Sequence, residues 1–245
     1  MLKQTFILFI SLFFLLSSAH ANQTVTKEDI GETGNNMKNT ETNMDTVTDY
    51  DGNQYATIKI GDQIWMAENL RSLHYSDGTK IEEVFTYKND EKNASTYGRL
   101  YTWATVANEH KISPKGWRLP TDDDWKKLEK YLGMDEKDIE DTGWRDTESE
   151  AIRLKKEQED FLWFNYSKRG VNSSGLSVIP AGVRSKSGSF KGMGGFADFW
   201  SSSEFDSEKA WNRSLTWSWL HPAKAKIYRK NIDKRWGFSI RCIKN

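Results

Sequence analysis

The chain has 245 residues with 35 basic and 35 acidic side chains, so its formal net charge is zero. This balance argues against a general nucleic-acid binder, which needs a positive surface. The single cysteine, Cys242, excludes an internal disulfide, and a chain of this length can bury a core large enough to fold without one.

The first residues have the features of a signal peptide. Lys3 is a positive charge ahead of an apolar run from Phe6 to Leu16. Ala19 and Ala21 flank one residue in the small-x-small pattern of a cleavage site. The apolar run is too short to span a bilayer comfortably. We therefore expect residues 1–21 to direct export to the periplasm, the cell surface or the medium, with no transmembrane segment left after cleavage.

The next part of the chain changes character near Thr46. Residues 22–45 are rich in Asn, Thr, Glu and Lys, and such a composition cannot offset the entropy cost of ordering. We expect a flexible linker there and one folded domain over residues 46–245. The domain begins with short alternating runs up to Met66, separated by turns at Asp51–Asn53 and Gly61–Asp62, which predicts a β-meander.

Two helices are predicted in the following segments. Residues 96–108 carry apolar side chains at helical spacing, namely Tyr97, Leu100, Tyr101 and Ala104. A second helix is predicted from Thr121 to Leu132, because Thr121 is a good N-cap and Asp124 follows three positions later. The apolar face of this helix consists of Trp125, Leu128 and Leu132.

Three consecutive carboxylates, Asp122, Asp123 and Asp124, follow this N-cap. They admit a metal-binding interpretation and a capping interpretation. Carboxylates at a helix N-terminus are favoured by the exposed amide groups and by the helix dipole. We expect the capping role.

The second half of the chain has weaker patterns. Residues 134–160 are highly charged and predict an acidic insertion or a helix. From Phe161 onward the chain is rich in Gly, Ser and aromatic residues in short apolar runs. This predicts an irregular half with short strands and many loops.

Eight blocks along the chain resemble, in order, the Fibrobacter succinogenes major paralogous domain, which occurs in exported bacterial proteins of the Bacteroidetes and Fibrobacteres. The blocks are Asp49–Tyr55 (DYDGNQY), Ile60–Leu70 (IGDQIWMAENL), Tyr97–Tyr101 (YGRLY), Pro114–Thr121 (PKGWRLPT), Gly175–Gly182 (GLSVIPAG), Phe199–Glu204 (FWSSSE), Ala210–Trp211 (AW) and Gly237–Cys242 (GFSIRC). That family is in turn similar to the C-type-lectin-like and formylglycine-generating-enzyme folds.

The resemblance implies an α+β fold in which two helices pack against small twisted antiparallel sheets with long irregular loops. It also implies that both ends of the domain meet in one sheet. Family members carry a cysteine just before the block at Pro114, which could pair with the cysteine of the last strand. That position is Ser113 here, so we expect Cys242 to be a free, buried thiol that packs as a small hydrophobe.

Catalysis is not expected. The related formylglycine-generating oxidases need two thiols to hold copper, and this chain has one. The related iron enzymes need a His cluster, whereas His74, His110 and His221 stand far apart without the spacing that puts two ligands on one helical face.

A binding role has more support, because the chain contains 11 Trp residues, and indole rings suit both sugar stacking and protein anchoring. Most of them are expected to pack in the core: Trp65, Trp103, Trp117, Trp125, Trp200 and Trp211. Trp217 and Trp219 lie between the family blocks and are the candidates for exposed ligand contacts. The candidate polar contacts near them are Arg213, His221, Arg229 and Asn231.

Glu68 and Asn69 form a second, weaker candidate site. A carboxylate beside an amide carbonyl suits Ca²⁺, and the alternative is that both side chains bond backbone around the loop. We therefore expect an exported, non-catalytic binding or adhesion protein of the cell envelope, with a glycan or a cell-surface protein as its ligand. A structural or assembly subunit of an envelope complex and a divergent enzyme of the related fold remain alternatives.

Overall fold

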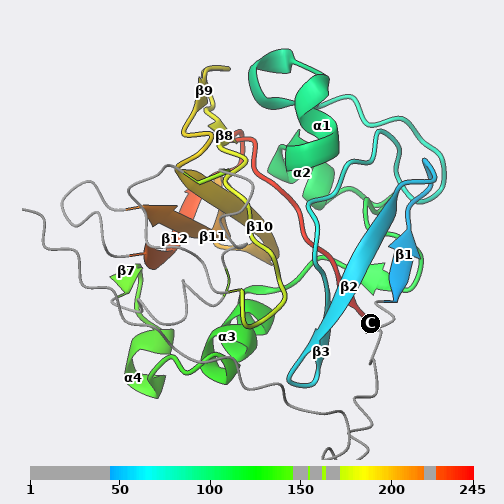
Figure 1. Ribbon diagram of the computed structural model, residues 1–245. Coiled ribbons are helices and arrows are strands. Elements are labelled where there is room, and N and C mark those ends of the chain that lie inside the picture. Colours follow the sequence, from blue (N-terminus) through cyan, green and yellow to red (C-terminus); the bar gives the residue numbers. More distant parts are fainter. Residues whose placement is uncertain (1–44, 146–153, 155–161, 164–171, 218–224) are drawn as a thin grey trace, which may run out of the picture. The chain divides into compact units, whose positions relative to one another are not determined.

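The computed structural model describes residues 45–145, 154, 162–163, 172–217 and 225–245. All of them belong to one compact unit, Thr42–Asn245. Small antiparallel sheets dominate this unit and helices are few, so the domain is a sheet-rich α+β structure (Figure 1).

The first sheet has five strands in the order β1-β2-β3-β13-β6. Their bounds are Thr46–Thr48 (β1), Gln54–Ile60 (β2), Gln63–Met66 (β3), Ile243–Lys244 (β13) and Trp117–Arg118 (β6). Strands β1 to β3 confirm the predicted meander (Figure 1). Ile243 of β13 lies opposite Trp65 on one side and Arg118 on the other. The first and last described strands therefore share one sheet, as the family resemblance implied.

The second sheet has four strands in the order β10-β11-β12-β7. Their bounds are Phe196–Glu204 (β10), Lys209–Trp217 (β11), Ala225–Asp233 (β12) and Gly143–Arg145 (β7). The prediction of short strands in this half holds for β13, which has two residues, and is wrong for β10, β11 and β12, which have nine residues each. The pattern was misleading because β10 is buried on both faces from Ala197 to Ser201, which removes the polar alternation of a surface strand.

This second sheet separates two hydrophobic cores. On one face, Phe199, Leu215 and Ile227 join a core that also contains Trp125. On the other face, residues of the same strands join a second core. The members of that core include Trp200, Ala210, Tyr101, Phe238 and Cys242. Cys242 is fully buried, as expected for a thiol that packs as a small hydrophobe.

Helix α3 (Asp122–Tyr131) confirms the helix predicted after Thr121. The Thr121 hydroxyl accepts from the Asp124 N–H at 3.1 Å, and the Asp124 carboxylate accepts from the Thr121 N–H at 2.8 Å, which completes a capping box. Leu128 and Trp125 are buried on its apolar face. Gly133, with φ of +101°, follows the helix end.

The helix predicted over residues 96–108 is wrong. Helix α1 (Lys92–Tyr97) ends at Gly98, and the chain then forms strand β5 (Leu100–Tyr101) before the short helix α2 (Trp103–Val106). Gly98 has φ of +75°, a conformation that no helix contains. Beyond it, β5 pairs with β4 (Val84–Phe85), and this tertiary pairing overrides the helical spacing.

The remaining described elements are short. They are η1 (Tyr87–Asn89), α4 (Glu136–Ile139), β8 (Val183–Arg184) and β9 (Phe190–Lys191). Strands β8 and β9 form a hairpin. The charged segment from residue 134 thus contains a helical turn and the edge strand β7, which the sequence pattern did not separate.

Candidate functional site

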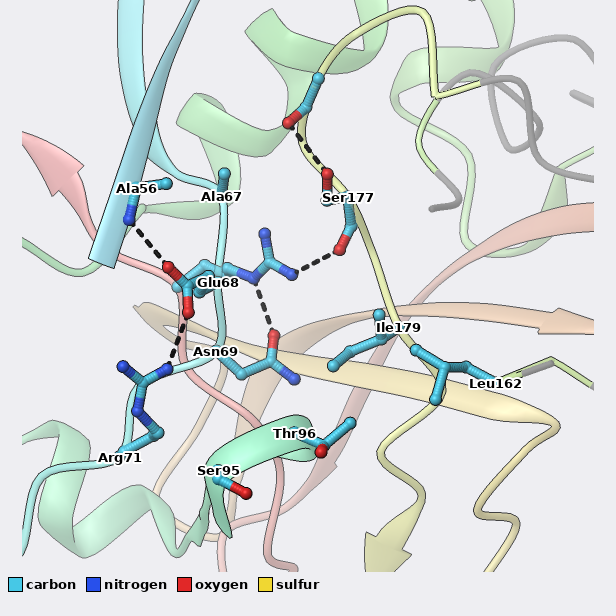
Figure 2. A pocket seen from close by; sticks show the side chains of 12 residues that line it. Ala56, Ala67, Glu68, Asn69, Arg71, Ser95, Thr96, Leu162, Ser177 and Ile179 are labelled. Atoms are coloured by element: carbon cyan, nitrogen blue, oxygen red, sulfur yellow. Dashed lines mark hydrogen bonds and ion pairs between the residues drawn. The ribbon is translucent and has the colours of Figure 1, made fainter. Parts of the chain in front are cut away.

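A pocket of about 570 Å³ lies where β2, the turn after β3 and helix α1 meet the segment from Gly175 to Ile179. We call it the Arg241 pocket. Glu68, Arg71 and Arg241 supply its charges. Ser95, Thr96 and Ser177 bring hydroxyl groups to the same lining, and Ile179 and Leu162 add apolar surface (Figure 2).

Glu68 is held in a fixed orientation at this pocket. Its Oε1 accepts from the Ala56 N–H at 2.9 Å and its Oε2 accepts from Arg71 Nη1 at 2.8 Å, as Figure 2 shows. Burial opposes ionisation, but the Ala56 N–H and Arg71 outweigh it and lower the pKa of Glu68 below its ordinary value. The carboxylate therefore remains charged, and 42% of its side chain is exposed.

Arg71 is fixed from two directions. Besides its contact with Glu68, its Nη2 donates to the Gln54 carbonyl at 2.7 Å. The guanidinium also lies 4.5 Å from the centroid of the Tyr55 ring, a cation–π distance. Glu68 and Arg71 thus form a rigid donor–acceptor pair at the pocket wall.

Arg241 is a buried cation that has no carboxylate at hydrogen-bond distance among the residues that the structure describes. Its Nε donates to Asn69 Oδ1 at 2.7 Å, and its two Nη groups donate to the backbone carbonyls of Met66, Leu176 and Ser177. Burial lowers the pKa of Arg241 to about 9, and the charge of Glu68 partly offsets this. The guanidinium remains protonated at neutral pH and leaves the pocket with a net positive charge.

Glu68 and Asn69, the candidate residues for a Ca²⁺ site, are both held by hydrogen bonds within the protein. Both Glu68 oxygens already accept protein hydrogen bonds, and the carbonyl oxygen of Asn69 faces Arg241. Asn69 Nδ2 donates to the Tyr97 carbonyl at 2.9 Å. The bonds to the Ala56 N–H and the Tyr97 carbonyl are backbone contacts of the kind that the alternative interpretation expected, although they join segments 12 and 28 positions apart. Among the described residues, no group of three or more His, Cys, Asp or Glu side chains could hold a metal ion.

Two of the predicted ligand contacts, Arg213 and Arg229, lie in a buried ionic cluster. Arg213 is fully buried and donates to Asp122 at 2.6 Å and to Glu129 at 2.7 Å. Arg229 Nη2 donates to Asp122 at 2.7 Å, and Glu129 also pairs with Arg145 at 2.6 Å. Because their charges are paired inside the protein, Arg213 and Arg229 join α3 to the sheet and are not available to a surface ligand.

The other predicted contacts are less completely described. Asn231 is half-buried on β12, opposite Trp211. The backbone of Trp217 pairs with Ala225 at the end of β11, and its side chain is not described. Trp219 and His221 lie outside the described residues.

The three aspartates at the start of α3 have separate roles. Asp124 closes the capping box and also accepts from Arg118 Nη2 at 3.0 Å. Asp123 is exposed and lies 3.3 Å from Lys126. Asp122 is the anion shared by Arg213 and Arg229, so the capping interpretation accounts for Asp124 but leaves out the larger role of Asp122.

The family model described as Fibrobacter succinogenes major domain matches residues 58–244. The chain belongs to this family. A comparison with curated proteins and another with solved structures gave no match. Within the described part of this Fibrobacter succinogenes major domain, no helix is long and apolar enough to cross a membrane.

The aromatic residues of the domain divide into packed and exposed groups. Trp65, Trp125 and Trp200 are fully buried, which confirms their expected packing role. Sequence reasoning missed Trp144, which is 54% exposed on β7, with its ring centroid 4.5 Å from that of Tyr228 on β12. The charged sequence around Trp144 gave no sign that it belonged to a strand.

Proposed function

We propose that this chain is an exported, non-catalytic binding protein of the bacterial cell envelope, with a lectin-like α+β domain that binds a carbohydrate in the Arg241 pocket. The observation that carries the proposal is the fixed, partly exposed carboxylate of Glu68 beside the guanidinium of Arg71. An ionised carboxylate has about four lone-pair positions, and two of those on Glu68 are occupied. The others can accept hydrogen bonds from ligand hydroxyl groups.

The rest of the lining suits a polyhydroxylated ligand. Ser95 and Thr96 are exposed on α1 and can both donate and accept hydrogen bonds (Figure 2). Ile179 offers apolar surface to the C–H face of a sugar ring. Because Glu68 and Arg71 are already ordered, a ligand would meet little entropy cost in fixing them. A pocket of about 570 Å³ lies in the size range of small-molecule sites.

A glycan array probed with the purified protein tests the proposal, followed by calorimetry with any neutral glycan that binds. Thr96→Trp fills the pocket from an exposed helix position, so we expect it to abolish binding with an unchanged melting temperature. Lys92→Trp is the matched control, since Lys92 is exposed on the same helix and does not line the pocket. Binding that survives in the Thr96→Trp variant would refute the site.

The alternative is a subunit of an envelope assembly, and the exposed Trp144, which packs on the half-buried Tyr228, favours it. Aromatic residues of this kind often anchor protein interfaces. A blank glycan array together with a stable co-purifying partner that is lost in Trp144→Ala would support this alternative and overturn the carbohydrate proposal.

A further inference from the structure

A second pocket of about 510 Å³ gathers basic side chains from three segments, and we call it the Arg184 pocket. Its lining includes Trp103 at the start of α2, which is half-buried. Arg184 and Lys186 come from the β8–β9 hairpin, and Lys234 and Arg235 come from the turn after β12.

Three of these four cations have carboxylate partners. Lys186 and Arg235 share Asp233, at 3.3 Å and 2.5 Å. Lys234 pairs with Glu204 and also lies over the Trp103 ring, 4.6 Å from its centroid. With Glu83, which also lines the pocket, four cations face three carboxylates, and the pocket carries a formal net charge of +1.

Arg184 is the cation without a partner. Its guanidinium carbon lies 3.9 Å from the centroid of the Phe85 ring, so the group is stacked on an aromatic face. Within the described part of the chain, no hydrogen bond or ion pair reaches this guanidinium. Every other arginine that the structure describes makes at least one such contact: Arg71, Arg99, Arg118, Arg145, Arg213, Arg229, Arg235 and Arg241.

The backbone fixes the base of this side chain. Arg184 and Gly237 exchange two backbone hydrogen bonds of 3.0 Å and 2.8 Å. A Cβ at Gly237 would lie 3.1 Å from the Arg184 Cβ, so the absence of a side chain there makes room for the arginine. The stacked guanidinium is thus oriented by Phe85 while its N–H edges remain unpaired.

We propose that the Arg184 pocket binds an oxyanion, namely a carboxylate, sulfate or phosphate group, carried on a small polar molecule such as an acidic sugar. A planar guanidinium recognises such groups through two parallel N–H bonds, and stacking pre-orients it for this contact. The pocket is larger than a bare oxyanion requires, and Trp103 and Ala104 supply surface for the rest of the ligand. The proposal does not depend on what the Arg241 pocket binds.

Calorimetry with the full chain at constant ionic strength tests this site, with sodium glucuronate, sulfate and phosphate as probes and glucose as the neutral control. We expect the anions to bind and glucose not to bind. Arg184→Gln should weaken anion binding by roughly tenfold or more, the loss of one charge-assisted contact. Arg184→Lys keeps the charge without the planar fork and should give an intermediate loss.

Lys191→Gln is the matched control, because Lys191 is exposed on the same hairpin and does not line the pocket. Its affinity for each probe should equal that of the wild type, and the melting temperature of every variant shows whether it is folded. Tighter binding of glucuronate than of sulfate would show that the pocket also contacts the sugar, and equal binding would show that the oxyanion suffices. Absence of anion binding by the folded wild type, or an unchanged affinity in folded Arg184→Gln and Arg184→Lys, would overturn the proposal.

Discussion

Arg241 donates through Nε to Asn69 Oδ1 at 2.7 Å, although the two residues are 172 positions apart in the sequence. Asn69 also donates to the Tyr97 carbonyl and to the Ser239 hydroxyl. This one amide therefore joins the turn after β3 to the end of α1 and to the segment that leads into β13.

Replacing Asn69 by alanine should lower the free energy of unfolding by about 2–3 kcal/mol, because it leaves a buried Arg241 N–H without an acceptor. Ser95→Ala changes an exposed residue of the same pocket and should stay within about 0.5 kcal/mol of the wild type. Urea denaturation measures both. Equal effects of the two substitutions would contradict the role assigned to Asn69.

Of the three aspartates at the start of α3, Asp122 should contribute most to the free energy of unfolding. Its removal in Asp122→Asn leaves Arg213 and Arg229 buried with a weaker partner, which should cost about 3–5 kcal/mol of unfolding free energy. Asp123→Asn, one position along the same helix, changes an exposed side chain and should be nearly neutral. The difference between these neighbours separates the ionic cluster from a general effect of charge at the helix N-terminus.

Asp122 should also make the free energy of unfolding depend on pH in the acid range. Burial would raise the pKa of Asp122, but Arg229 and Arg213 outweigh it and lower the pKa to about 2, below the unfolded value of about 3.9. The contribution of Asp122 to stability is therefore complete above about pH 4 and is lost as the pH falls towards 2. Unfolding free energies measured across this range should fall more steeply for the wild type than for Asp122→Asn. Parallel curves would contradict the assignment.

Cys242 should be unreactive in the folded protein. Burial, with a further contribution from Asp49, raises the pKa of its thiol far above the ordinary value, so almost no thiolate forms. Titration with a chromogenic disulfide reagent should detect no thiol under native conditions and one thiol after denaturation in guanidinium. Rapid reaction of the folded protein would show that Cys242 is accessible.

Gly98 and Gly52 both have a positive φ, +75° and +82°, but differ in their surroundings. An alanine Cβ at Gly98 would lie 2.6 Å from the Asn69 Cβ, whereas one at Gly52 would have no neighbour within 4 Å. Gly52→Ala should cost about 1–2 kcal/mol from backbone strain alone. Gly98→Ala should cost about 1–3 kcal/mol more in the same denaturation experiment, from the steric overlap and from a ψ of −162°, which together with a positive φ is nearly confined to glycine.

Local signals predicted the parts of the fold that local interactions determine. The capping box of Thr121 and Asp124 lies within four consecutive residues, so it can be read from the sequence. The turn at Gly61 likewise joins β2 and β3, whatever packs against them. The helix predicted across Gly98 failed because β5 pairs with β4, a contact that spacing within one segment cannot reveal. The length of β10 was missed because a strand covered on both faces does not alternate.

The candidate sites were harder to predict than the fold, because they depend on contacts between side chains that are far apart in the sequence. Arg213 and Arg229 were expected to contact a ligand beside Trp217 and Trp219, but the tertiary structure buries both and pairs them with Asp122. Arg184 carries no sequence signal at all. Among the described arginines, Arg184 differs from the others in having no hydrogen-bond or ion-pair partner, and only the folded structure reveals this difference.

The position of β13 has a consequence for biosynthesis. Ile243 lies between β3 and β6, so these two strands have no common neighbour until residues 243–244 have been synthesised. A nascent or truncated chain that lacks them exposes two unpaired strand edges, which are templates for aggregation. A chain truncated before residue 243 should therefore be more prone to aggregation than the full chain.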